Sequence, residues 1–192
     1  MIRPSGSGSP ARSVSPEATI LAAMSRSPFD DAFAHHVWAT LRLIDTCSAL
    51  TRDQLDAGVP GTYGSILETM RHLVEGDTYY LSHLTGDPAR EIDSSHLDLG
   101  ELRAAMEADE RTWIELLAEN LNFDAVVRDV DQGGYQRDAS IGIRLAQALH
   151  HGTDHRSQIC TALTSLGIEP PEIDIWGFGA HTGRVVEIPP TS

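Results

Sequence analysis

Apolar residues recur at three- and four-residue spacing in four stretches of this chain, the pattern that is typical of amphipathic helices. The four stretches cover residues 28–50, 65–86, 98–120 and 140–166. Ser, Asp and Pro are favoured at helix starts and glycine at helix ends, and such residues lie at most of these boundaries. The boundary residues are Ser27 with Pro28, Ser65 with Glu68, Gly86, Asp98 with Glu101, and Gly167. Four helices of about 20 residues or more predict an all-α four-helix bundle.

The segments outside these stretches lack the helical period. Residues 123–137 contain valines followed by Gly133-Gly134, which predicts a small hairpin or ordered loop before the last helix. Residues 172–192 are predicted to form an irregular tail that holds Trp176, Phe178 and His181. Residues 1–26 are rich in Ser, Pro and Gly and are predicted to be a disordered tail. We therefore expect one domain, over residues 27–192.

Composition excludes several classes of function. The 192 residues carry a formal net charge of −14, so we expect no nucleic-acid or anionic-membrane partner, because phosphate binding needs clustered basic side chains. No apolar stretch reaches 18 residues, so no membrane span is expected. Cys47 and Cys160 are predicted to be buried thiols in a reducing compartment, and we expect the cytoplasm. No phosphate-binding glycine loop or nucleophile elbow is present.

The segment His-His-Gly-Thr-Asp-His-Arg at residues 150–156 carries the strongest chemical signal. His151 and His155 are four residues apart, so on a helix both imidazoles lie on one face and can bind one divalent metal ion. The pair lacks the glutamate of H-E-x-x-H, so the general base of a metalloprotease is missing. A third ligand must come from another helix. His72 is one candidate, and His36 is a rival that lies nearer the centre of its own apolar stripe.

Two acidic residues, Asp77 and Asp109, also fall on apolar stripes. Burying a carboxylate costs free energy unless it is paired, and Arg156 is the expected partner. Such an ion pair would fix the register of the helices, or it would orient a ligating imidazole. Arg103 and Arg144 are expected to be solvated.

Residues 150–159, His-His-Gly-Thr-Asp-His-Arg-Ser-Gln-Ile, are similar to the N-H-x-x-x-H-R-G-Q signature of the DinB/YfiT-like superfamily. The stretch 65–84 resembles the second-helix pattern of that superfamily, with His72 seven residues after the capping serine and Asp77 five residues later. The resemblance covers about residues 28–180. The chain departs from the pattern at His150, where asparagine is usual, and at Ser157, where glycine is usual.

This resemblance implies a four-helix bundle of the DinB/YfiT type with a metal site formed by His72, His151 and His155. It implies one divalent ion per chain (Ni, Zn or Fe), a small-molecule substrate, a low-molecular-weight thiol as co-substrate, and a homodimer. His36 and Asp77 then become candidates for positioning a ligand or shuttling a proton. Thiol S-transfer is the favoured reaction, by analogy. The alternatives are a hydrolase or isomerase with the same fold, and a non-catalytic, stress-linked bundle with a structural metal.

Overall fold

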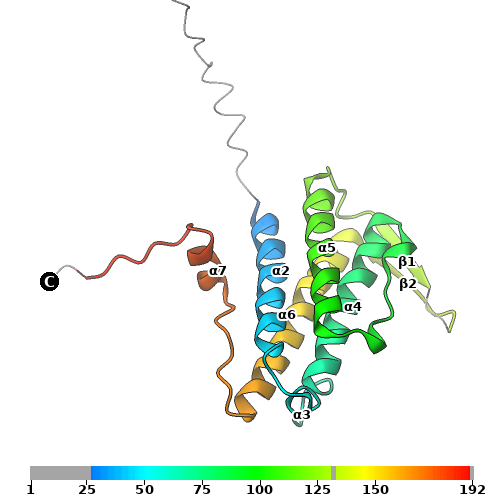
Figure 1. Ribbon diagram of the computed structural model, residues 1–192. Helices are drawn as coiled ribbons and strands as arrows, with labels where there is room; N and C mark the ends of the chain where they lie inside the picture. The colour runs from blue at the N-terminus through cyan, green and yellow to red at the C-terminus, as the bar shows by residue number, and fades with distance from the viewer. Residues whose placement is uncertain (1–26, 131–132, 191–192) are drawn as a thin grey trace, which may run out of the picture.

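The computed structural model describes residues 27–130 and 133–190, and most of these residues are helical. Four long helices lie lengthwise against one another (Figure 1). They are α2 (Pro28–Cys47), α4 (Ile66–Thr85), α5 (Leu99–Ala118) and α6 (Ile141–Ser165). This confirms the predicted helical class. The predicted disordered tail, residues 1–26, lies outside the described residues.

The starts of three long helices follow from local hydrogen bonding that the sequence predicts. The side chains of Ser27, Ser65 and Asp98 each accept a hydrogen bond from the backbone N–H three residues on. The acidic side chain at that later position in turn accepts one from the backbone N–H of the capping residue. Helix α4 ends at Gly86, whose φ of 70° lies in the left-handed region that favours glycine. Helix α2 ends at Cys47 rather than near Leu50 as predicted.

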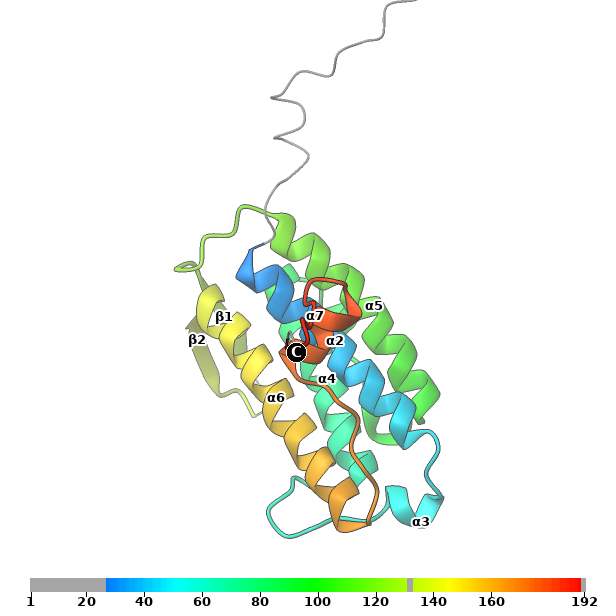
Figure 2. The ribbon, with the colours of Figure 1, turned by 90° about the vertical axis from the view of Figure 1, so that its left-hand side faces the viewer.

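Each long helix packs against two others, so the apolar stripes meet in one core (Figure 2). Helix α2 lies against α5 and α6, and α4 lies against the same two helices. Cys47 is buried in this core and Cys160 is half-buried, and both thiols are free. The core is filled mainly by large side chains, among them Phe33, Leu43, Met70, Leu73, Leu102, Met106, Trp113, Leu145 and Ile159.

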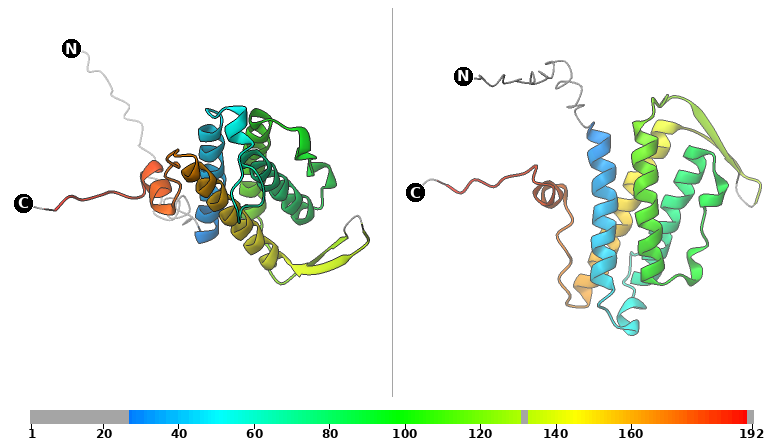
Figure 3. Two further views of the ribbon diagram at one scale, coloured as in Figure 1. Left: turned by 90° about the horizontal axis from the view of Figure 1, so that it is seen from below. Right: turned by 45° about the horizontal axis from the view of Figure 1, so that its top comes forward.

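A two-stranded antiparallel hairpin precedes α6, as the valine-rich segment predicts (Figure 3). Its strands are β1 (Val126–Val130) and β2 (Gln136–Ser140). The buried carboxylate of Asp129 on β1 accepts hydrogen bonds from Tyr79 of α4 at 2.8 Å and from Arg144 of α6 at 3.3 Å. The expectation that Arg144 is solvated is therefore wrong, because the hairpin covers it and supplies a counter-charge.

The segments outside the four long helices contain short helices that periodicity does not predict. These are α3 (Arg52–Leu55), η1 (Pro88–Arg90), η2 (Ser94–His96) and α7 (Ile175–His181). Helix α7 corrects the predicted irregular tail: Asp174 caps its start, and Phe178 packs on Trp38 of α2 with ring centroids 5.5 Å apart. No helix in the described part of the chain is both long and apolar enough to cross a bilayer.

Candidate metal centre

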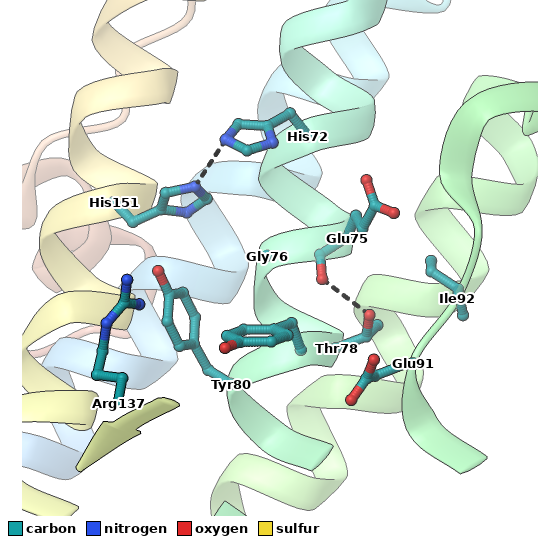
Figure 4. A pocket seen from close by; sticks show the side chains of 10 residues that line it. His72, Glu75, Gly76, Thr78, Tyr80, Glu91, Ile92, Arg137 and His151 are labelled. Carbon is teal, nitrogen blue, oxygen red and sulfur yellow. Dashed lines mark hydrogen bonds between the residues drawn. The ribbon is translucent and has the colours of Figure 1, made fainter. Parts of the chain in front are cut away.

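His72 of α4 and His151 and His155 of α6 form one cluster where the two helices lie side by side. One potential ligand atom from each imidazole lies within 4.8 Å of the other two. The Nε2 atoms of His72 and His151 are 3.2 Å apart and face one another (Figure 4). Two nitrogens bound tetrahedrally to a zinc ion at about 2.0–2.1 Å lie about 3.3 Å apart. The observed spacing therefore suits two ligands of one metal ion.

A glycine on α4 makes this approach possible. Gly76 lies one turn after His72, and a Cβ atom at Gly76 would come within 2.4 Å of Cε1 and 3.0 Å of Nδ1 of His151. Real Cβ atoms essentially never come so close to another heavy atom. Gly76 thus gives the imidazole of α6 the space it occupies against α4. Sequence analysis did not identify this residue, because glycine carries no chemical signal of its own.

The orientation of His155 is set by Gln158, one turn further along α6. Oε1 of Gln158 accepts a hydrogen bond from the backbone N–H of Tyr63 at 2.8 Å, which identifies this atom as the amide oxygen. Nδ1 of His155 lies 3.3 Å from the same oxygen and so donates its proton to it. Nε2 of His155 then keeps its lone pair, as a metal ligand requires.

Tyr63 also covers the cluster with its ring. The ring is stacked on the imidazole of His72, with centroids 4.0 Å apart and planes inclined by 5°. It meets the ring of His155 edge-on at 5.5 Å. Sequence analysis missed both Tyr63 and Gln158. The glutamine stands in the quoted helix motif, whereas the position of Tyr63 depends on how its loop folds back onto α6.

The surroundings of the cluster favour neutral imidazoles. Burial, and then the neighbouring His155 and His72, lower the pKa of His151 to about 4. Burial and His155 also lower the pKa of His72, although Glu75 opposes them. Nδ1 of His151 is buried and has no hydrogen-bond partner among the described residues. Neutral imidazole is the form that binds a metal ion, so the donor set fits a divalent metal.

His36, the rival third ligand, lies apart from this cluster in a buried polar chain. Its Nε2 is 2.7 Å from Oδ2 of Asp77, and its Nδ1 is 2.9 Å from the guanidinium of Arg156. Because arginine only donates, Nδ1 accepts, and Nε2 carries the proton that goes to Asp77. Both ring nitrogens are thus engaged. The predicted ion pair of Arg156 with Asp77 also needs correction, because the imidazole of His36 lies between them.

Gly152 makes room for this chain in the same way that Gly76 makes room for His151. A Cβ atom at Gly152 would lie 2.2 Å from Cε1 of His36 and 2.9 Å from the guanidinium of Arg156. His36 and Asp77 have fully buried side chains. Burial lowers the pKa of Arg156 to about 10, against the attraction of Asp77. This polar chain of His36, Asp77 and Arg156 links α2, α4 and α6.

Asp109 of α5 does not pair with Arg156 either. Its side chain is buried, and its Oδ2 has no hydrogen-bond partner within the described chain. Burial, and then the negative charge of Asp77, raise the pKa of Asp109 to about 8, although Arg90 opposes them. Near neutral pH this carboxyl group is therefore largely protonated, which explains how two acidic residues share one core.

A cavity of about 360 Å³ opens beside the cluster, between α4, α6, the hairpin and the η1 segment (Figure 4). A second hollow of about 430 Å³ lies on the other side of His72, towards Tyr63 and η2. His36 and Asp77 line neither of them. The first cavity is lined by His72, Glu75, Gly76, Thr78, Tyr79, Tyr80, Glu91, Ile92, Arg137 and His151.

Fold and site together define a mostly helical protein with a three-histidine cluster beside an open cavity, an arrangement that can hold a metal ion. Comparison with known families matches residues 24–184 to the DinB family. The match covers most of the chain, and the protein belongs to this family. A search of curated proteins gives no match.

Proposed function

We propose that this DinB-family protein is a four-helix bundle of the DinB/YfiT type and a metal-dependent enzyme. In this proposal it binds one divalent metal ion through His72, His151 and His155. The convergence of three imidazoles, two of which line an open cavity, is the observation that carries the proposal. Structural zinc sites usually have four protein ligands, whereas catalytic sites have three and leave one position open. No fourth His, Cys, Asp or Glu joins the cluster within the described residues.

Thiol S-transfer is the reaction we favour, with Ni, Zn or Fe as the ion. Support comes from the similarity of residues 150–159 to a signature found in thiol S-transferases of this superfamily, and from a cavity that accepts a small molecule beside the ligands. A divalent ion supplies Lewis acidity, which lowers the pKa of a thiol or a water molecule that it binds. In a homodimer, which the resemblance also implies, each chain would have its own site.

The chain's own residues would hold and orient this ion. Gln158 fixes the imidazole of His155 through Nδ1, and the ring of Tyr63 shields the outer side of His72. His36 and Asp77 were expected to position a ligand or shuttle a proton. Because both are fully buried and line neither cavity, we assign them positioning: they hold α2 and α4 against α6 through Arg156.

Activity assays with and without metal test this function. The protein loaded with Zn²⁺, Ni²⁺ or Fe²⁺ is incubated with cysteine and a panel of electrophiles, and loss of free thiol is followed. We expect a thiol-transfer rate above the uncatalysed one, which EDTA and His151→Ala both abolish. His150→Ala is the matched control, because His150 is the exposed neighbour outside the cluster. Equal rates with and without metal would contradict thiol transfer, and metal-dependent hydrolysis without thiol would favour a hydrolase.

A further inference from the structure

The hairpin places an arginine at the wall of the cavity beside the three-histidine cluster. Arg137 on β2 is directly opposite Asp129 on β1. Residues opposite each other in an antiparallel pair project from the same face of the sheet. Because Asp129 is buried against α4 and α6, Arg137 also lies on the hairpin face that is turned towards these helices. The hairpin therefore directs this guanidinium towards the cavity.

Arg137 forms no direct bond to an acidic side chain, although its charge attracts the nearby carboxylate of Asp129. Asp129 is already bound by the hydroxyl of Tyr79 and the guanidinium of Arg144, so this ion pair is neutral as a whole. Within the described chain, Arg137 makes no hydrogen bond or ion pair, whereas its neighbour on β1, Arg128, pairs with Asp138 through two hydrogen bonds. An exposed guanidinium whose hydrogen-bond donors are unused, at the wall of a cavity in an acidic protein, is a candidate binding group for an anion.

The cavity extends from Arg137 to the three-histidine cluster. It is lined by Arg137 together with His72 and His151, and its volume of about 360 Å³ suits a small molecule. Figure 4 shows Arg137 and Tyr80 on one wall, both pointing towards His151. The hydroxyl of Tyr80 accepts only a long hydrogen bond of 3.4 Å from Gln147, so its own proton is available to a ligand. One small ligand can therefore contact the histidines and Arg137 together.

The opposite wall of the cavity is acidic, which limits the charge that a ligand can carry. Glu75 and Glu91 line this wall (Figure 4), and each accepts a hydrogen bond from a serine hydroxyl through one carboxylate oxygen. These carboxylates repel a second anionic group. The cavity thus suits a ligand with a single carboxylate at the Arg137 wall and a neutral or cationic remainder.

We propose that Arg137 is a specificity-determining residue that binds the carboxylate of a small monocarboxylic substrate, while the other end of that substrate reaches the three-histidine site. This inference rests on the proposed function, because it places the substrate beside the metal ligands. It adds a substrate class: small molecules with one carboxylate group.

Calorimetric titration of the Zn²⁺-loaded protein with two simple thiols tests the proposal. 3-Mercaptopropionate carries a carboxylate and 2-mercaptoethanol carries a hydroxyl group in its place. We expect wild-type protein to bind 3-mercaptopropionate about tenfold more tightly, as a charge-assisted bond of roughly this strength implies. Arg137→Gln should abolish this preference and leave the binding of 2-mercaptoethanol and of Zn²⁺ unchanged. Arg137→Lys, which keeps the positive charge, should retain part of the preference.

Arg111→Gln is the matched control. Arg111 of α5 is likewise exposed and makes no hydrogen bond or ion pair within the described chain, but it does not line the cavity. Equal binding of the two thiols by the wild-type protein would overturn the role assigned to Arg137, and so would a preference that survives in Arg137→Gln. Neither result would touch the proposed metal site. An equal loss in Arg111→Gln would show a general charge effect and would overturn it too. If the wild-type protein takes up no Zn²⁺, this is seen before any thiol is added, and that result overturns the proposed function itself.

Discussion

Replacing Gly76 by alanine is expected to weaken metal binding while leaving the metal-free fold intact. The new Cβ would lie 2.4 Å from Cε1 of His151, whereas ordinary contacts begin at 3.4 Å, so the imidazole must retreat by about 1 Å. Metal–ligand distances tolerate deviations of only about 0.2 Å. The variant therefore loses or distorts one of three ligands, and we expect an affinity loss on the order of 100-fold, or about 3 kcal/mol.

The metal-free protein should respond in the opposite direction. His151 is half-buried but borders the cavity, so its ring can move into this space without disturbing the core. Alanine in a helix interior is more favourable than glycine by roughly 0.5–1 kcal/mol. The metal-free variant should thus unfold at the same or a slightly higher temperature than the metal-free wild type.

Two assays separate these effects: competition for Zn²⁺ with a chromophoric chelator, and thermal unfolding of the metal-free protein. Gly100→Ala in α5 is the control, because a Cβ there meets only a carboxylate oxygen of Asp98, at 3.2 Å, and lies outside the cluster. Unchanged Zn²⁺ affinity in Gly76→Ala would refute the position given to His151. A large loss of metal-free stability would refute the claim that the ring can retreat cheaply.

Three further substitutions test the surroundings of the site. Burial raises the pKa of Asp109 to about 8, so the folded state holds this proton more tightly than the unfolded state, and stability falls as pH rises from about 4 to 8. Asp109→Asn removes this titration. As pH rises from about 5 to about 8, the free energy of unfolding of the variant, measured with urea, should rise relative to that of the wild type by on the order of 3 kcal/mol. Parallel pH profiles of the two proteins would contradict the raised pKa. Gln158→Leu removes the acceptor for Nδ1 of His155, so Zn²⁺ affinity should fall by about 10- to 100-fold in the chelator competition, and an unchanged affinity would argue against this orienting role. Arg156→Gln leaves Asp77 buried without a cation, which should cost about 3 kcal/mol of unfolding free energy; a loss below about 1 kcal/mol would show that the polar chain contributes little.

The helices could be predicted from the sequence because their signals are local. Ser65 with Glu68 and Asp98 with Glu101 satisfy helix starts through contacts three residues apart, and the structure shows these capping boxes. Helix α7 escaped prediction because its seven residues include two glycines, which lower helix propensity. Its stability comes instead from packing against α2.

The candidate site could be predicted only in part, because helical periodicity identifies the core and not the edge of a groove. His36 lies at the centre of its stripe and is consequently buried in the polar chain with Asp77. His72 lies off the centre, and this offset places it at the groove between α4 and α6 where a site with an open side can form. The burial of Arg144 depends on the hairpin, and the position of Tyr63 depends on a loop, so neither has a periodic signal.

Metal content measured by elemental analysis tests the central claim most directly. The chain is purified, stripped with chelator, reloaded with Zn²⁺, Ni²⁺ or Fe²⁺, and freed of excess ion by gel filtration. We expect about one divalent ion per wild-type chain, a full complement in His150→Ala, and none in the His151→Ala, His155→Ala double variant. Full metal retention by the double variant would contradict the three-histidine site.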